Sequence, residues 1–217
     1  MAQRLKPEVR DRIIASAETV FARDGFLSAK MAEIAAVAGL SAGNVYRYFP
    51  GKDALFGAVI DPGFVARFDD LLDQRVHSLS GTQALAGPHS ATANRAASTD
   101  DDAAEAADAM LRFWIAHRLR VVVLLDRCEG SPFADFGQRF VDRLVAMAVA
   151  HIQALRGGKT IPELVPFTLT TVFHTSRRAV VSILETYTTE PEIRAAFEAF
   201  WSFQVAGLAG LTTWAVQ

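Results

Sequence analysis

At 217 residues, with 51% hydrophobic and 21% charged side chains, the chain has the composition of a packed globular protein, which excludes a disordered one. Its net charge is −2, but residues 1–52 hold eight basic side chains against five acidic ones, and the remainder holds fourteen against nineteen. Only the N-terminal part therefore has the positive charge that attracts phosphate.

Apolar side chains recur every three or four residues along almost the whole chain, which predicts an all-α fold of about nine helices. In the N-terminal part the pattern predicts helices over 7–25, 31–38 and 42–49. Gly39 ends the second of these, and Ser41 is placed to cap the third.

A longer helical pattern runs from Lys52 to about Val76 and is interrupted by the triplet Asp-Pro-Gly at 61–63. A proline inside a helix removes a backbone hydrogen bond and crowds the carbonyl four residues earlier. We therefore predict a kink or a split near residues 58–63.

Residues 78–99 are rich in Ala, Ser, Thr and Gly and lack periodicity, so they are predicted to form a loop. The acidic residues 100–102 suit a helix N-terminus better than a metal site. Further helical segments are then expected, first around Trp114 and afterwards over approximately 119–128, 133–156, 164–187 and 190–213.

The last two predicted helices are strongly apolar and joined by a tight turn at 188–189, which predicts an αα-hairpin. Residues 199–217 carry no charge, but their polar side chains and lack of basic anchors favour a buried or dimer-forming helix over a membrane span. Stripes this apolar predict a four-helix interface across the two-fold axis of a homodimer. The residues expected on that exposed interface are Phe173, Val180, Ile183, Phe197, Phe200, Trp201, Gln204 and Leu208.

A short motif lies between Ala32 and Lys52, where the sequence reads AEIAAVAGLSAGNVYRYFPGK. An Ala-Gly turn is followed by a Ser-x-Gly helix start, and the aromatic pair Tyr46 and Phe49 precedes Lys52. This segment resembles the helix-turn-helix of TetR-family transcriptional regulators. The resemblance extends back through the apolar positions of the first predicted helix and forward to Leu55, and beyond residue 60 it rests only on the number and order of helices.

The third predicted helix has the chemistry needed to read a major groove. Ala42 and Gly43 are small enough to let the backbone approach base edges. Asn44 can bind adenine or phosphate, and Arg47 can bind guanine or the backbone. Ser41 and the helix N-terminus can hold a phosphate.

The resemblance adds four further contacts. Positions that match Tyr46, Tyr48 and Lys52 contact the DNA backbone in TetR-family proteins, and the position matching Lys30 is often a polar phosphate contact. Where this chain has Tyr48, the family more often has a histidine, but an aromatic donor is kept. The position matching Ala42 is polar in some relatives but not here, so base reading is expected to depend on Asn44 and Arg47.

Alternatives stay open for several of these residues. Tyr48 is either a backbone contact or mainly a core aromatic, and Arg47 is either a DNA contact or part of a solvated face. Arg4 and Lys6 form either a basic arm or a disordered tail.

The resemblance also implies that the helices after residue 52 enclose a small-molecule pocket. Apolar walls with a few polar groups are what such a cavity requires, although aromatic stripes at helical spacing are also typical of a core. The candidate lining residues are Phe113, His117, Phe140, Met147, His151, Phe167, Thr171, His174 and Arg178.

The sequence therefore predicts a DNA-binding domain over 1–51 and a ligand-binding and dimerisation domain over 52–217. We expect a ligand-responsive regulator, as a rule a repressor in this family, that binds a palindromic operator as a homodimer and is released by a small-molecule effector. The alternative is an interaction protein of the same fold that has lost specific DNA binding.

No enzyme, cofactor or metal is expected, because the sequence lacks a phosphate-cradling Gly loop, a nucleophile elbow and a zinc spacing. The single cysteine, Cys128, is expected to be inert packing rather than a redox switch. The N-terminal residues lack the apolar core of a signal peptide, so a cytoplasmic protein without membrane contact is expected.

Overall fold

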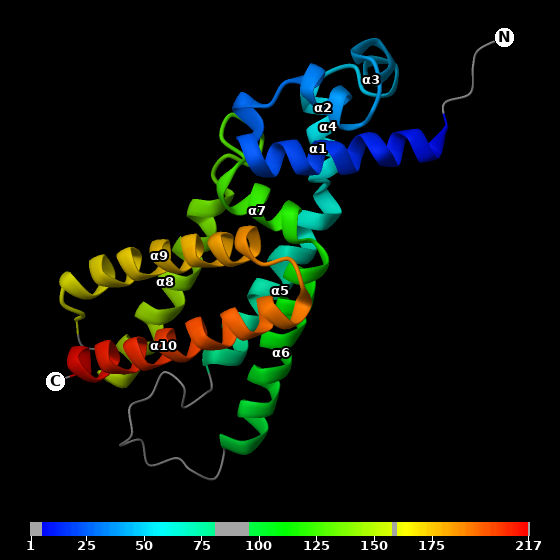
Figure 1. Cartoon of the computed structure of the whole chain (residues 1–217). Coiled ribbons are helices and arrows are strands. Elements are labelled where there is room, and N and C mark those ends of the chain that lie inside the picture. Colours follow the sequence, from blue (N-terminus) through cyan, green and yellow to red (C-terminus); the bar gives the residue numbers. More distant parts are fainter. Residues whose placement is uncertain (1–5, 81–95, 158–159, 217) are drawn as a thin grey trace. The chain divides into compact units, whose positions relative to one another are not determined.

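The computed structural model describes residues 6–80, 96–157 and 160–216, and these residues form ten helices and no strand (Figure 1). The predicted all-α class is therefore confirmed. The predicted loop at 78–99 is wrong at both ends, because residues 78–80 and 96–99 are helical, and its remainder, 81–95, lies outside the described residues. The helices are α1 Pro7–Ser28, α2 Met31–Val37, α3 Ala42–Tyr48, α4 Lys52–Val59, α5 Pro62–Ser80, α6 Ala96–Ala116, α7 Arg118–Asp126, α8 Phe136–Leu155, α9 Leu164–Thr186 and α10 Glu190–Val216.

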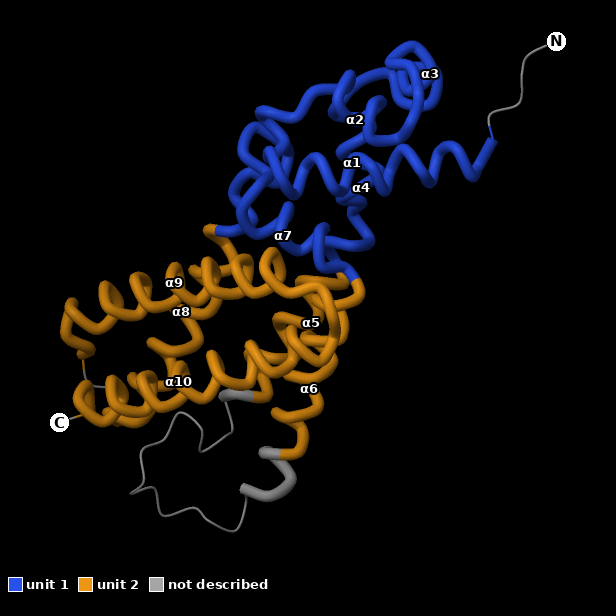
Figure 2. The backbone as a smooth tube through the Cα atoms, in the orientation of Figure 1, with its two compact units in different colours: residues 1–66, 117–137 blue, residues 67–116, 138–217 orange. Residues whose placement is uncertain are grey.

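The chain divides into two compact units (Figure 2). The first consists of Met1–Ala66 and His117–Gly137, and the second of Arg67–Ala116 and Gln138–Gln217. By contacts, α4 and α7 thus belong with the N-terminal helices. The division by function at residues 51 and 52 stays a prediction.

Helix α1 forms the centre of the first unit. It begins at Pro7, whose fixed φ suits the first helical turn. Along its inner face Ile13, Ala17, Val20 and Phe21 are completely buried. Each large apolar side chain buried in this way stabilises the folded state by about 1.5–3 kcal/mol. This face packs against α2, α4 and α7.

Three phenylalanines fix how α1 meets α4. The ring centroids of Phe21 and Phe56 lie 5.3 Å apart, and those of Phe26 and Phe56 lie 4.7 Å apart, both in edge-to-face geometry. Phe26 reaches this cluster because Gly25 adopts a φ of 77° and breaks the helix. The next amide, that of Phe26, then donates to Arg127 O at the end of α7 (2.8 Å).

The predicted interruption near Pro62 is confirmed as a split between α4 and α5. Asp61 occupies the cap position of α5, where its carboxylate accepts a hydrogen bond from the Phe64 amide (2.9 Å). The other carboxylate oxygen pairs with Arg120 of α7 (2.6 Å). The break is therefore stabilised by side chains rather than left as a distortion.

In the second unit the core surrounds Phe68, which is completely buried on α5. Its ring contacts Phe113 and Trp114 of α6 and Phe140 of α8, with centroids 5.9, 6.3 and 6.1 Å away. On the more exposed side, Arg143 of α8 pairs with Asp69 (2.6 Å) and with Asp73 of α5.

Helices α9 and α10 form the predicted hairpin and pack against each other (Figure 1). Inside the hairpin, the Gln204 amide donates to Ser176 Oγ (2.6 Å), and both side chains are buried. Among the described residues, no helix is both long enough and apolar enough to cross a bilayer.

The Asp61 cap gives a pH-dependent prediction. Burial acts to raise the pKa of Asp61, but the hydrogen bond from Phe64 N–H and the pairing with Arg120 outweigh it, so the pKa lies below its ordinary value. A carboxyl with a lowered pKa stabilises the fold above its unfolded pKa of about 3.9, and that stabilisation is lost as the pH falls. Asp61→Ala should lower the free energy of unfolding by about 1 kcal/mol at pH 7.

Urea unfolding at several pH values measures this difference. We expect it to shrink as the pH falls below 4, and Asp61→Asn, which keeps a capping oxygen but loses the charge, should give an intermediate value. A difference that does not change with pH would contradict the role assigned to the carboxylate.

Candidate nucleic-acid interface

The turn between α2 and α3 has the hydrogen bonds of a Schellman motif. The amide of Leu40 donates to Ala35 O (2.9 Å) and that of Gly39 to Ala36 O (3.0 Å). Gly39 adopts a φ of 65°, which is strained for residues with a side chain. The predicted stop at Gly39 is thus confirmed, and it sets the direction in which α3 starts.

Helix α3 is capped as the sequence predicts and is anchored by two apolar side chains. Ser41 occupies its N-cap, and its hydroxyl accepts a hydrogen bond from the Asn44 amide (3.3 Å). Val45 is completely buried, and Phe49 is 4% exposed. Two apolar anchors therefore hold one side of a seven-residue helix against the unit and leave the other side in solvent.

The solvent side of α3 has the residues expected to read DNA. Tyr46 is 51% exposed, and Arg47 and Gly43 are also exposed. Asn44 lies one turn before Arg47 and accepts a long hydrogen bond from its guanidinium (3.5 Å). A Cβ built on Gly43 would meet no atom within 4 Å, so the fold itself does not require glycine at this position.

Tyr48 is half-buried and joins the end of α3 to the start of α1. Its phenol oxygen accepts a hydrogen bond from the backbone amide of Lys6 (3.1 Å). The phenol O–H keeps its own proton to donate. Lys6 is therefore placed beside α3, whereas Arg4 lies outside the described residues.

Lys52 has a structural role that the sequence did not indicate. Its ammonium donates to Leu27 O (2.9 Å) and to Ala29 O (3.1 Å), and it lies 4.7 Å from the centre of the Phe26 ring. These contacts close the loop between α1 and α2. An ammonium has three N–H donors, so one stays available for a phosphate.

Two other basic side chains frame the same surface. Lys30 is exposed at the N-terminus of α2. Arg10, which we did not predict as a contact, lies over the ring of Phe49 at 5.3 Å. Arg10 is on α1, far from the motif in sequence, so periodicity gave no sign that it would lie beside α3. Arg23, by contrast, is paired with Asp24 and Glu33.

Residues 13–59, which span α1 to α4, match the model of the family described as bacterial regulatory proteins, tetR family. These residues form a tetR-family domain. The predicted resemblance is confirmed, and the matched residues include the Schellman turn, the cap and the anchors of α3. None of the curated proteins compared with the chain matches it significantly.

Solved structures extend the likeness beyond this tetR-family domain. The chain is 25% identical to a TetR-like transcriptional regulator from Rhodococcus sp. RHA1, with a TM-score of 0.52, over 95% of this chain and 100% of that one. It is 16% identical to the fatty acid degradation regulator FadR from Bacillus halodurans, over 95% and 98% of the two chains, with a TM-score of 0.48. It is 17% identical to NalD, the secondary repressor of the MexAB-OprM multidrug efflux pump in Pseudomonas aeruginosa, over 90% and 95%, with a TM-score of 0.41. The first match supports a TetR-like fold along nearly the whole chain.

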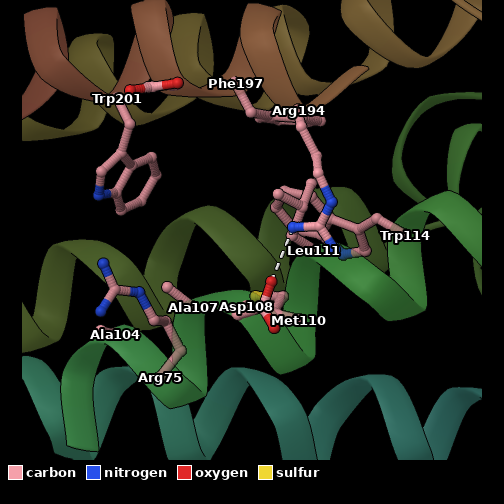
Figure 3. A pocket seen from close by; sticks show the side chains of 11 residues that line it. Arg75, Ala104, Ala107, Asp108, Met110, Leu111, Trp114, Arg194, Phe197 and Trp201 are labelled. Atoms are coloured by element: carbon pink, nitrogen blue, oxygen red, sulfur yellow. Dashed lines mark hydrogen bonds and ion pairs between the residues drawn. The ribbon is translucent and has the colours of Figure 1, made fainter. Parts of the chain in front are cut away.

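The second unit contains a cavity of about 470 Å³ (Figure 3). None of the nine residues predicted to line a pocket lines this cavity. Phe113 and Phe140 pack around Phe68 instead, Met147 belongs to an apolar cluster, and His117 lies in the first unit. The residues that line the cavity are Arg75, Ala104, Ala107, Asp108, Met110, Leu111, Trp114, Arg194, Phe197, Glu198 and Trp201.

The two faces of α9 are interchanged relative to our expectation. Phe167 is 69% exposed, and Thr171 and Arg178 are also exposed, although all three were expected in a pocket. Phe173 and Val180 were expected on an exposed interface but are buried. His174 and Ile183 are half-buried, as is His151 of α8.

The α10 residues expected at the interface are also turned inward for the most part. Phe197 is buried and lines the cavity, whereas Trp201 lines it but is 37% exposed, as expected. Gln204 is hydrogen-bonded within the hairpin. Leu208 packs against Met147, and Phe200 is half-buried. The expectation that these side chains form one exposed stripe is therefore wrong, because most of them contact their own chain.

Substitutions at Lys52 and Tyr46 test which of these residues stabilises the fold. Lys52→Met removes two hydrogen bonds from a charged donor, so we expect the free energy of unfolding to fall by about 1–3 kcal/mol. Tyr46→Ala removes an exposed side chain and should change it by less than about 0.5 kcal/mol. Urea unfolding of both variants measures the difference, and equal stabilities would contradict the structural role of Lys52.

Proposed function

We propose that the chain is a ligand-responsive transcription regulator, acting as a repressor, that binds a palindromic operator as a homodimer. The observation that carries the proposal is the solvent side of α3, which is small at its start and polar along its length, in a tetR-family domain. A regulator acts on chromosomal DNA, so we place it in the bacterial cytoplasm.

In this proposal α3 enters the major groove and two long side chains read bases. Arg47 can form a bidentate pair with guanine, and Asn44 can do the same with adenine. Ala42 and Gly43 bring the backbone close to the groove floor, which explains a glycine that the fold does not need.

Backbone contacts supply much of the affinity, since only two side chains read bases. Tyr46 and Lys30 are exposed and can reach phosphates directly. Tyr48 and Lys52 contribute the donors that their internal hydrogen bonds leave over. Ser41 is exposed at the start of α3, where the partial positive charge of the helix N-terminus can also attract a phosphate.

A homodimer is needed to place two such helices on one operator. On α10, Phe203 and Trp214 are 75% and 50% exposed, and Gly207 and Gly210 lie between them with open space beside their backbones. The spacing of four, three and four residues puts all four on one helix face. We propose that this stripe packs against its copy across a two-fold axis, in place of the stripe expected from the sequence.

Binding of the effector and binding of DNA are proposed to be linked equilibria. A ligand in the second unit weakens DNA binding only if it prefers the chain conformation that does not fit both half-sites. Residues of α5 belong to both units, so this helix, which starts at the Asp61 cap, is the connection that we propose transmits the change.

The DNA contacts give the test of the proposal. Using the fluorescence anisotropy of labelled duplex DNA, we expect Arg47→Ala to weaken binding to the preferred sequence by about 1–3 kcal/mol and to relax specificity at one position per half-site. Tyr46→Ala should weaken binding by similar amounts on all sequences.

Glu163→Gln, an exposed change in the second unit that does not line the cavity, is the control and should leave binding unchanged. If Arg47→Ala and Tyr46→Ala bound as tightly as the unmodified chain with the same salt dependence, α3 would not be the reading helix. The chain would then fit the alternative, an interaction protein of this fold without specific DNA binding.

A further inference from the structure

The cavity of the second unit lies between α5, α6 and α10. Its volume of about 470 Å³ falls within the range of small-molecule sites. Most of its wall is apolar, with Met110, Leu111 and Trp114 from α6 and Phe197 and Trp201 from α10. The apolar part of a ligand of moderate size would pack well against this wall.

One charged side chain is buried in this apolar wall. Arg75 is 7% exposed and lies on the same face of α5 as the buried residues Phe64, Phe68 and Leu71, with spacings of four, three and four residues. In Figure 3 its guanidinium faces Trp201, and the distance to the ring centre is 5.1 Å. One N–H group donates to Ala103 O (3.1 Å).

Arg75 has no carboxylate partner among the described residues. A guanidinium has five N–H donors, and one backbone carbonyl satisfies only part of them. Burial lowers the pKa of Arg75 to about 10, so the side chain is still charged at neutral pH. A buried charge without a counter-ion destabilises a fold unless a partner compensates for it.

Two of the other charges at the cavity pair with each other, and the third is exposed to solvent. Asp108 pairs with Arg194 (2.7 Å) and with Arg112, and Figure 3 shows its bond to Arg194 crossing from α6 to α10. Hydrogen bonding to Arg194 lowers the pKa of Asp108, so it stays ionised. Glu198 is exposed and does not pair with Arg75. Arg75 is thus the charge that a ligand would have to balance.

We propose that this cavity binds an apolar molecule that carries a single carboxylate, with the carboxylate on Arg75 and the apolar body along Trp114, Phe197 and Trp201. The assignment rests on the proposed function, because it gives the chemical class of the effector. A planar carboxylate matches the fork of a guanidinium. A phosphate dianion would leave one negative charge uncompensated in an apolar site, and a neutral ligand would leave Arg75 unbalanced.

Calorimetric titration of the full chain without DNA tests the assignment. The probes are decanoate and 2-naphthoate, which present a carboxylate on a flexible and on a flat apolar body, together with decanol, 2-naphthylmethanol and decyl phosphate. We expect at least one carboxylate to bind the unmodified chain at least about tenfold more tightly than its alcohol and than decyl phosphate.

Arg75→Met should weaken binding of that carboxylate at least about tenfold and leave binding of the alcohol unchanged. Because this change removes an uncompensated buried charge, the Tm of the free protein should be unchanged or higher. Arg67→Met, an exposed change on the same helix that does not line the cavity, is the matched control and should bind the carboxylate as the unmodified chain does.

Ala107→Phe fills the cavity while Arg75 is kept, and should weaken the carboxylate and the alcohol alike. The assignment is overturned if neither carboxylate binds, if Arg75→Met binds it equally well, or if decyl phosphate binds more tightly. None of these titrations contains DNA, so a chain that binds carboxylates through Arg75 but does not bind duplex DNA would contradict only the proposed function.

Discussion

The burial of Val45 and Phe49 is the constraint on which the DNA-binding surface depends. A helix of seven residues is too short to be stable alone in water, so packing against the rest of the unit must hold it. These two anchors, together with the left-handed Gly39 before them and the Ser41 cap, decide which side of α3 is left in solvent. Arg47 and Tyr46 are presented outward for this reason.

The polar residues around α3 serve the fold and the surface together. Lys52 closes the loop between α1 and α2, and Tyr48 ties the end of α3 to the first turn of α1. A phosphate bound by either residue would therefore contact a group that already fixes the geometry of α3. The surface is therefore preorganised for binding. A Lys52 variant can also bind DNA less tightly because its fold is less stable, so its stability must be measured as well.

Local features were predictable from the sequence, and long-range ones were not. The stop at Gly39, the Ser41 cap and the break at Pro62 each depend on a few adjacent residues, and all three are found. The two faces of α9 were predicted the wrong way round because Phe167 and Phe173 are both apolar. Periodicity shows that a helix has two faces, but it does not show which neighbouring element covers each face. Arg75 was missed, although a charged residue at an apolar stripe position of α5 was a signal that could have revealed it.

Selection of bound sequences from random duplex DNA tests the central claim most directly, namely that α3 reads DNA as part of a two-fold dimer. The account predicts an enriched palindrome with half-site centres about one helical turn, or roughly 34–36 Å, apart. Phe203→Glu, which puts a charge on the proposed α10 interface, should lose the symmetric enrichment. Absence of any enriched sequence at low salt, or an asymmetric single site for the unmodified chain, would contradict it.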